Sequence, residues 1–259
     1  MTSRKGAKMS ELDFYEKAKN WDFSHINMYE DCMTDWDYYG ELYDHTTEES
    51  RILDLGTGGG ENVLKHFPKA KEIVGTDFSE EMIKTANENL KKYNKENIVF
   101  RVMDNLNMDV EPESFDIITA RHTIIDAKGI YNALKPNGYL ILRGVDKLDC
   151  WALKRLFGKG QAYNDPKPIS LIDYEDLLDA GFKHVELIPI HMREYYKTKE
   201  DLKLLLYKAP ILTDFSEVDG MKEVIPNIDE TLIDKYIEEN TTDKGILLIR
   251  RYYGIVAQK

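Results

Sequence analysis

The chain has few cysteines, and that scarcity excludes two classes of protein. Only Cys32 and Cys150 occur in 259 residues, and no CxxC pair or Cys/His ligand spacing is present. A disulfide scaffold and a structural zinc site both need more cysteines at closer spacing. We therefore expect a protein of a reducing cytoplasm, with no metal site, whose fold depends on a hydrophobic core.

Long apolar runs are also lacking. The runs YLIL at 139–142 and LLL at 204–206 are far too short for a bilayer, which takes about 20 apolar residues to cross. Met1 to Lys8 is basic but no apolar stretch follows it, so we expect no signal peptide. The sequence predicts a soluble, cytoplasmic protein without a membrane partner, and it leaves the oligomeric state open.

Positive charge is scarce as well. There are 35 basic against 47 acidic residues, and the net charge is -12. An acidic body repels phosphate backbones, so broad nucleic-acid binding is disfavoured. One local basic cluster, Lys147, Lys154, Arg155 and Lys159, leaves three interpretations open: a solvated helix face, a clamp for an anionic substrate, or an RNA contact.

What the sequence does contain is an alternation of short apolar runs with amphipathic segments. Strands are predicted at 52–55, 72–75, 98–103, 115–119 and 139–142, and helices at 61–67, 79–93 and 127–134. Such alternation predicts an α/β fold with a doubly wound, mostly parallel sheet.

After residue 143 the pattern loosens. Helices are predicted at 150–157, 170–180, 198–207 and 230–238, and strands at 185–190 and 250–257. We expect one domain over 51–259 with a lid insertion at about 194–244, which selects the substrate together with 145–168. The aromatic-rich residues 1–50 are predicted to form an N-terminal helical cap.

A glycine-rich turn, DLGTGGG at 54–60, directly follows the strand at 52–55. Glycines tolerate positive φ and let a ligand approach the backbone, and the next helix offers free N–H groups. A dinucleotide-binding turn of the GxGxxG type would need glycine where Glu61 stands, and Asp54 and Glu61 would repel a pyrophosphate. The turn therefore favours a cationic ligand over a dinucleotide.

This turn resembles the first motif of class I methyltransferases, which use S-adenosylmethionine (SAM). Further elements resemble the family's motifs in order: VGTDFS at 74–79, MDN at 103–105, FDIITARH at 115–122 and LKPNG at 134–138. The resemblance implies a seven-stranded sheet with an antiparallel last strand. It also implies SAM as cofactor and S-adenosylhomocysteine as product.

The resemblance assigns cofactor-binding roles along these motifs: Asp54, Gly56, Thr57, Gly58, Gly60, Asp77, Phe78, Met82, Asp104, Asn105 and Arg121. In the family, the acid at the position of Asp77 binds both ribose hydroxyls, and the acid at Asp104 reads the adenine amino group. Trp36, Tyr38 and Tyr39 are candidates to face the sulfonium, since N-terminal segments in this family often fold over the cofactor. Packing the leading helices onto the sheet is the alternative role for these rings.

Methyl transfer from a sulfonium is an in-line displacement that needs neither a metal nor a covalent intermediate. The candidates for catalysis follow the fourth strand: His122 as general base, or Arg121 to orient an anionic acceptor. A structural histidine and a surface arginine are the alternative.

The acceptor is the least determined part of the function. ARH at 120–122, Tyr195, Tyr196 and KAP at 208–210 look like a loosely characterised bacterial branch of the family. That branch is distantly similar to ribosomal RNA guanine methyltransferases, which usually carry an N-terminal cysteine zinc module that this chain lacks. A small-molecule acceptor is therefore favoured. An RNA-base methyltransferase and a catalytically silent SAM-binding protein are the alternatives.

Overall fold

The computed structural model describes residues 25–216, 220–221 and 227–259. They divide into two compact units, each assembled from segments far apart in the sequence. The sheet unit consists of Trp36–Gly144, Ser170–Ile188 and Tyr253–Lys259. The second unit consists of the described residues up to Asp35, Val145–Ile169 and Pro189–Tyr252.

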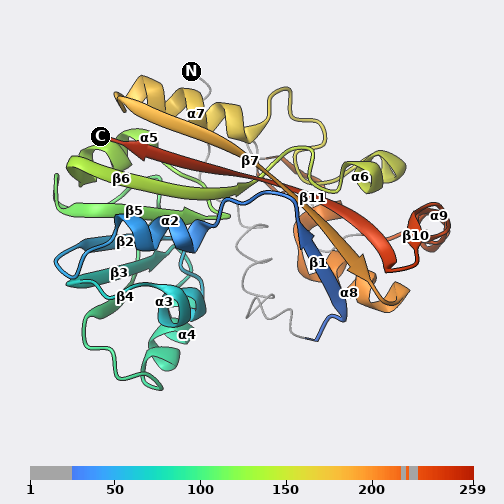
Figure 1. Cartoon of the computed structure of the whole chain (residues 1–259), viewed down its shortest axis with the longest axis horizontal. Coiled ribbons are helices and arrows are strands. Elements are labelled where there is room, and N and C mark those ends of the chain that lie inside the picture. Colours follow the sequence, from blue (N-terminus) through green and yellow to red (C-terminus); the bar gives the residue numbers. More distant parts are fainter. Residues whose placement is uncertain (1–24, 217–219, 222–226) are drawn as a thin grey trace. The chain divides into compact units, whose positions relative to one another are not determined.

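The sheet unit has strands flanked by helices (Figure 1). Its strands are β2 (Arg51–Leu55), β3 (Glu72–Asp77), β4 (Ile98–Val102), β5 (Phe115–Arg121) and β6 (Leu134–Val145), with parts of β7 (His184–Tyr196) and β11 (Gly245–Gln258). Its helices are α2 (Tyr38–His45), α3 (Glu61–His66), α4 (Glu80–Leu90), α5 (Ala127–Ala133) and α7 (Ile169–Ala180). The strand order is β7-β11-β6-β5-β2-β3-β4.

The sheet has the parallel core that the sequence predicts. β2 pairs in parallel with both β3 and β5, β3 with β4, and β5 with β6. The last strand runs the other way. The backbone N–H of Lys259 donates to Gly138, and that of Asp146 donates to Arg251, so residue numbers rise in β6 as they fall in β11. The antiparallel last strand is confirmed.

The central strands are buried, as parallel strands covered on two faces must be. Ile52, Leu53 and Leu55 of β2 have no exposed surface. The helix α4 begins where its sequence directs, because Ser79 caps it by accepting from the N–H of Met82 at 3.3 Å. Asn137, an exposed residue of β6 just before its buried length, has φ 64°, a left-handed conformation that Asn tolerates.

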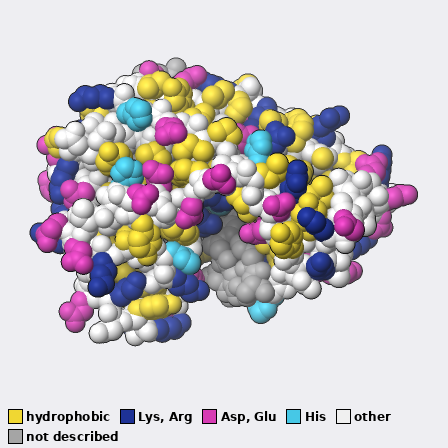
Figure 2. Space-filling model, in the orientation of Figure 1, with side chains coloured by type: hydrophobic (Ala, Val, Ile, Leu, Met, Phe, Trp, Pro, Cys, Tyr) yellow, Lys and Arg dark blue, Asp and Glu magenta, His cyan; other side chains and the backbone are white. Residues whose placement is uncertain are grey.

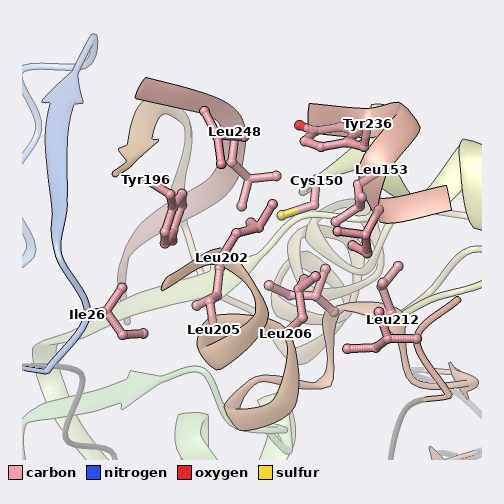
Figure 3. Close-up of a cluster of buried hydrophobic side chains, with 14 residues drawn as sticks. Ile26, Cys150, Leu153, Tyr196, Leu202, Leu205, Leu206, Leu212, Tyr236 and Leu248 are labelled. Carbon is pink, nitrogen blue, oxygen red and sulfur yellow. The ribbon is translucent and has the colours of Figure 1, made fainter. Parts of the chain in front are cut away.

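The second unit has a hydrophobic core of its own. It contains β1 (Met28–Cys32), α6 (Trp151–Phe157), α8 (Lys199–Lys208), η1 (Pro210–Leu212), β8 (Phe215–Ser216), β9 (Gly220–Met221), α9 (Glu230–Asn240) and β10 (Thr241–Thr242). In Figure 3, leucines of α8 point toward side chains of α6, η1 and β11. Thr198 caps α8 by accepting from the N–H of Asp201 at 3.1 Å, so the predicted helix start is confirmed.

An ionic network lies buried in the second unit. The Arg250 guanidinium donates to Asp149 and to Glu194, with N–O distances between 2.9 and 3.3 Å. The Tyr196 hydroxyl donates to Glu194 at 2.5 Å. Each buried carboxylate therefore has a charged or hydroxyl partner, which is the condition under which burial of charge is tolerated.

The N-terminal segment differs from the predicted helical cap. Residues 1–24 lie outside the described residues. Met28–Cys32 is a strand that pairs antiparallel with Met192–Tyr196, so the helical expectation is wrong there. A helix does occur at Tyr38–His45, within the sheet unit. Because β1 and β10 also join β7 and β11, nine strands are hydrogen-bonded rather than the seven expected.

The surface of the described residues carries mixed charge. Acidic and basic side chains are interspersed over the face shown in Figure 2. Within the described ranges, no helix has the length and apolar character that crossing a bilayer requires.

Candidate active site

The glycine turn between β2 and α3 is held in left-handed backbone conformations. Gly56, Gly58 and Gly60 have φ of 71°, 57° and 77°. A Cβ at Gly56 would lie 2.7 Å from Thr123, and one at Gly60 would lie 2.7 Å from the ring of Phe100. At Gly58, in contrast, no atom lies within 4 Å of the Cβ position. The middle of the turn therefore faces open space, where a ligand can approach the backbone.

Asp77, at the end of β3, joins this turn to the start of α4. Its Oδ2 accepts from the N–H of Gly58 at 3.0 Å, and its Oδ1 accepts from the N–H of Ser79 at 3.0 Å. Burial raises the pKa of Asp77, while the backbone hydrogen bonds from Ser79 and Gly58 oppose that effect. A carboxylate is thus fixed beside the open glycine.

Asp54 is the second buried carboxylate of the site. It lies in β2, is 6% exposed, and accepts from the Thr119 hydroxyl of β5 at 2.7 Å. Burial raises the pKa of Asp54 to about 6, and the hydrogen bond from Thr119 and the charge of Arg121 reduce the rise. Keeping this carboxylate ionised in the ligand-free protein therefore costs free energy. A cationic ligand beside it would stabilise the ionised form.

The remaining predicted cofactor residues lie after β3 and β4. Phe78 is half-buried and Met82 is buried on α4. Asp104 is exposed, and its oxygens accept from the N–H of Leu106 and the side-chain amide of Asn107. Asn105 is buried, and its amide nitrogen donates to the Thr123 hydroxyl at 3.0 Å. Asp104 therefore already forms a local turn, whereas Asn105 connects the loops after β4 and β5.

The aromatic residues at the start of α2 and just before it have two different environments. The Trp36 ring packs against Gly254 of β11, and its N–H donates to Glu41 at 3.0 Å. The rings of Tyr38 and Tyr39 meet edge to face, with their centroids 5.1 Å apart. The charge of Asp54 raises the pKa of both hydroxyls and that of Arg121 lowers it. Trp36 thus packs on the sheet, while the two tyrosines lie near the charged groups of the site.

Four buried side-chain polar atoms of the sheet unit lack a hydrogen-bond partner. They are the hydroxyls of Tyr38, Tyr39 and Thr57 and the side-chain oxygen Oδ1 of Asn105. Unpaired buried polar atoms are uncommon, because each costs about 1–3 kcal/mol. Together with the open space at Gly58 and the two carboxylates, they fit a polar, partly cationic ligand such as SAM.

The candidate catalytic residues lie at the carboxyl end of β5. Arg121 is half-buried. His122 is exposed, has φ 55°, and its ring Nε2 contacts the guanidinium Nη1 of Arg143. Because a guanidinium can only donate, Nε2 acts as the acceptor there and Nδ1 carries the ring proton. In this arrangement the Nε2 lone pair of His122 accepts from Arg143 and so is not available to a methyl acceptor.

Two residues near the site were missed by the sequence analysis. Arg143 lies in β6 as the register partner of Arg121 in β5, and no pattern in the sequence pointed to it. Asn89 of α4 donates to the carbonyl of Gly59 at 3.0 Å and to Glu61 at 3.4 Å. No pattern in the sequence pointed to Asn89.

The predicted basic cluster lies only partly at the surface, where Arg155 is exposed. Lys154 is 1% exposed, and its ammonium donates to the carbonyls of Lys147 and Gln161. The Lys147 ammonium also donates to a carbonyl, that of Asp165. The interpretation as one solvated helix face is therefore wrong. Among the residues that the structure describes, no group of three or more His, Cys, Asp or Glu side chains could hold a metal ion.

Comparisons with known proteins agree with this geometry. Residues 46–170 match the family model of a methyltransferase domain. A ribosomal protein L11 methyltransferase of Listeria innocua is 30% identical over 40% of this chain and 35% of its own length. The uncharacterised methyltransferase YcgJ of Bacillus subtilis is 34% identical over 29% of each chain. The chain thus spans about a third of the length of the curated relatives it matches.

Solved structures show the same fold over most of the chain. YcgJ of Bacillus subtilis superposes with a TM-score of 0.54 at 18% identity, covering 86% of this chain and 97% of that one. The [4+2]-cyclase SpnF superposes with a TM-score of 0.55 at 15% identity, covering 100% of this chain and 99% of that one. The doubly wound sheet is thus the fold of these solved structures, and the acid-flanked glycine turn lies within residues 46–170, the part that matches the model of a methyltransferase domain.

Proposed function

We propose that this chain transfers the methyl group of SAM to a small-molecule acceptor. The observation that carries the proposal is the pairing of Asp77 with the open glycine turn. Its carboxylate is fixed by Gly58 and Ser79, beside a glycine whose Cβ position meets no atom. Such a pair suits a nucleoside, with the carboxylate at the ribose hydroxyls and the ligand lying against the bare backbone.

Different residues around the turn would bind different parts of the cofactor. Asp77 holds the ribose, with Phe78 and Met82 beside the adenine. The loop of Asp104 and Asn105 holds the adenine edge, supported by the unpaired oxygen of Asn105. Asp54 faces the cationic methionine end, supported by its burial and raised pKa. One wall of the cofactor site would be the glycine turn, with Gly56, Thr57, Gly58 and Gly60. Trp36 would position α2 by packing its ring against that of Tyr38.

SAM, when bound, supplies a methyl group activated by the positive sulfur. The chain's own residues then have to hold the acceptor in line with that methyl group and keep water away. Tyr38 and Tyr39 can exclude water, since Tyr38 is buried and Tyr39 half-buried. Arg121 orients the acceptor. His122 is the weaker candidate for a base, because its Nε2 accepts from Arg143.

The second unit would select the acceptor. The insertion at 194–244 folds with 145–168 around a hydrophobic core of its own, including Leu153, Leu202 and Leu206 (Figure 3). A separately cored segment on a cofactor-binding scaffold is a usual place for substrate specificity. The net charge of -12 favours a small molecule over RNA for that role.

The test is cofactor binding followed by a screen for the acceptor. Purified full-length chain should bind S-adenosylhomocysteine in calorimetry. It should also release that product from SAM with at least one member of a panel of small metabolites. Asp77→Asn should weaken binding by about 10-fold or more, because a charge-assisted hydrogen bond contributes roughly 1.5–3 kcal/mol.

The matched control is Asp179→Asn, which removes an exposed carboxylate from α7 and should leave binding unchanged. Binding without turnover across the panel would favour a catalytically silent protein. Turnover with RNA alone would favour the RNA-base alternative. Failure to bind either cofactor form would contradict the proposal as a whole.

A further inference from the structure

We propose that Arg121 and Arg143 form a subsite of the sheet unit that binds a carboxylate or phosphate group on the acceptor. The inference rests on the proposed function, because it describes the acceptor side of the same site. It assigns a chemical class to the acceptor, and it gives a role to Arg143.

The two arginines are neighbours in the sheet. Arg121 ends β5, and Arg143 is its register partner in the parallel strand β6. Partners on neighbouring strands are about 4.8 Å apart and direct their side chains to the same face. The carboxyl ends of parallel strands are also where ligands bind in doubly wound sheets. Two guanidiniums are thus placed together at the edge that carries the glycine turn.

Side chains of the sheet unit keep this pair together. The Arg143 guanidinium contacts the ring of His122, the residue that follows Arg121. Tyr39 of α2 lies close to both arginines: burial raises the pKa of its hydroxyl, and the charges of Arg121 and Arg143 oppose that rise. The same hydroxyl is buried and has no hydrogen-bond partner. One neutral hydroxyl donor therefore lies within the electrostatic influence of the two register-paired arginines.

Cofactor binding would make this point more positive. In the free protein the carboxylate of Asp54 acts on Arg121 and on Tyr39. With SAM bound as proposed, Asp54 would pair with the cofactor's ammonium group, and a sulfonium would be added nearby. Two arginines beside a sulfonium attract an anion and disfavour a cationic acceptor. Guanidinium forks suit carboxylate and phosphate oxygens in particular, because both can be bound by two N–H groups.

The subsite would orient the acceptor without taking part in bond making. The acceptor's lone pair forms the new bond to the methyl carbon, and the bond from that carbon to sulfur breaks. The bonding electron pair leaves with the sulfur as a neutral thioether. Any proton on the acceptor atom is released to solvent. The arginines hold the anionic group so that the nucleophilic atom stays in line.

The experiment measures anion binding to the full-length chain loaded with sinefungin, whose amine mimics the sulfonium charge. Inorganic phosphate and malonate are titrated separately at constant ionic strength, and 31P or 13C chemical shifts give the dissociation constants. Arg121→Gln and Arg143→Gln should each weaken binding of the preferred anion by about 10-fold, equivalent to about 1.4 kcal/mol. Arg143→Lys, which keeps the charge but loses the fork, should weaken it less.

Arg101→Gln is the matched control, because Arg101 is exposed on β4 and its guanidinium donates to the carbonyl of Asp109. It should bind both anions like the parent chain. Preference for phosphate or for malonate tells which group the acceptor carries. If neither anion binds, or all variants bind equally, the inference is wrong. Cofactor affinity is measured in parallel, so a variant that no longer binds sinefungin exposes a failure of the proposed function instead.

Discussion

Asp54 shows at the scale of one residue how a binding site can work against stability. Its pKa of about 6 in the folded protein lies above the ordinary carboxyl value of 3.8. A carboxyl whose folded pKa is raised stabilises the fold while it is protonated. That contribution is lost as the pH rises from about 4 to above 6, which leaves a cost of at most about 3 kcal/mol at neutral pH.

Replacing Asp54 with Asn should therefore stabilise the cofactor-free chain. We expect Asp54→Asn to raise the unfolding midpoint at pH 7.5, and to raise it less at pH 5, where the parent carboxyl is mostly protonated. The same variant should bind SAM more weakly, because the charge facing the ammonium is gone. Thermal unfolding at the two pH values, with calorimetry, measures both effects. A midpoint that falls equally at both pH values would show that the raised pKa has no consequence for stability.

His122 is the second residue whose role depends on one contact. With its Nε2 accepting from Arg143, the ring has no lone pair to offer an acceptor proton. We expect His122→Ala to keep turnover within about threefold of the parent, with an unchanged pH profile. Steady-state kinetics with the acceptor found in the screen provide the measurement. A fall of about 10²–10⁴-fold, the range typical of a lost general base, would restore histidine as the base.

The glycine turn is the element on which the site depends, and its glycines should not be equivalent. Gly58→Ala places a methyl group in open space, so its stability loss is limited to the cost of positive φ, about 1–2 kcal/mol. Gly60→Ala has a similar φ and also forces its Cβ to 2.7 Å from Phe100, which adds about 1–3 kcal/mol.

Chemical denaturation and cofactor titration together should separate the two variants. We expect Gly58→Ala to lose cofactor affinity with only the stability loss set by its positive φ, and Gly60→Ala to lose more stability. Equal affinity of Gly58→Ala and the parent would mean that the ligand does not approach this part of the backbone.

Elements of the sheet unit could be predicted because their sequence pattern has a physical cause. Buried parallel strands need continuous apolar runs, and β2, β3 and β5 have them. The structure extends β11 beyond its predicted start, over the apolar residues 245–249. It also extends β6 and β7 beyond the predicted ends, because polar residues continue the hydrogen-bonded ladder where the apolar run stops. Strand β1 was missed for the same reason. Its sequence, MYEDC, is mostly exposed, and its strand form comes from pairing with β7.

The candidate site could be predicted less completely than the fold. Motif positions located Asp54, Asp77 and the glycines, since the strand ends bring them together. The motif alone could not show that Asp104 bonds within its own turn, or that Lys154 is buried against carbonyls. Both facts depend on how a local loop folds, which the motif residues do not specify. Arg143 needed the register of β5 and β6, which no single-sequence pattern contains.

Net charge is the property of the whole molecule with the most direct consequence for partners. The chain carries -12, and the basic cluster that left room for RNA has a buried member in Lys154. We expect no retention of the purified chain on immobilised bulk RNA at about 0.15 M salt, since few phosphates could be neutralised. Passage over the column at 0.05 and 0.15 M salt is the measurement. Retention that weakens steeply with salt would revive an RNA substrate.

The division of β7 and β11 between the two units has a consequence for protein engineering. Lys183 bonds to Gln258, and Gly245 packs on the carbonyl of Tyr196, so one antiparallel register runs along both strands. That register sets Ile188 opposite Tyr253, the points where the chain leaves and re-enters the sheet unit. A short hairpin turn in place of 189–252 would join two facing positions and shorten both strands without breaking the sheet. Such a miniature would keep the proposed cofactor site and the proposed arginine subsite but lose the second unit, and so offers a smaller scaffold onto which other specificities could be grafted.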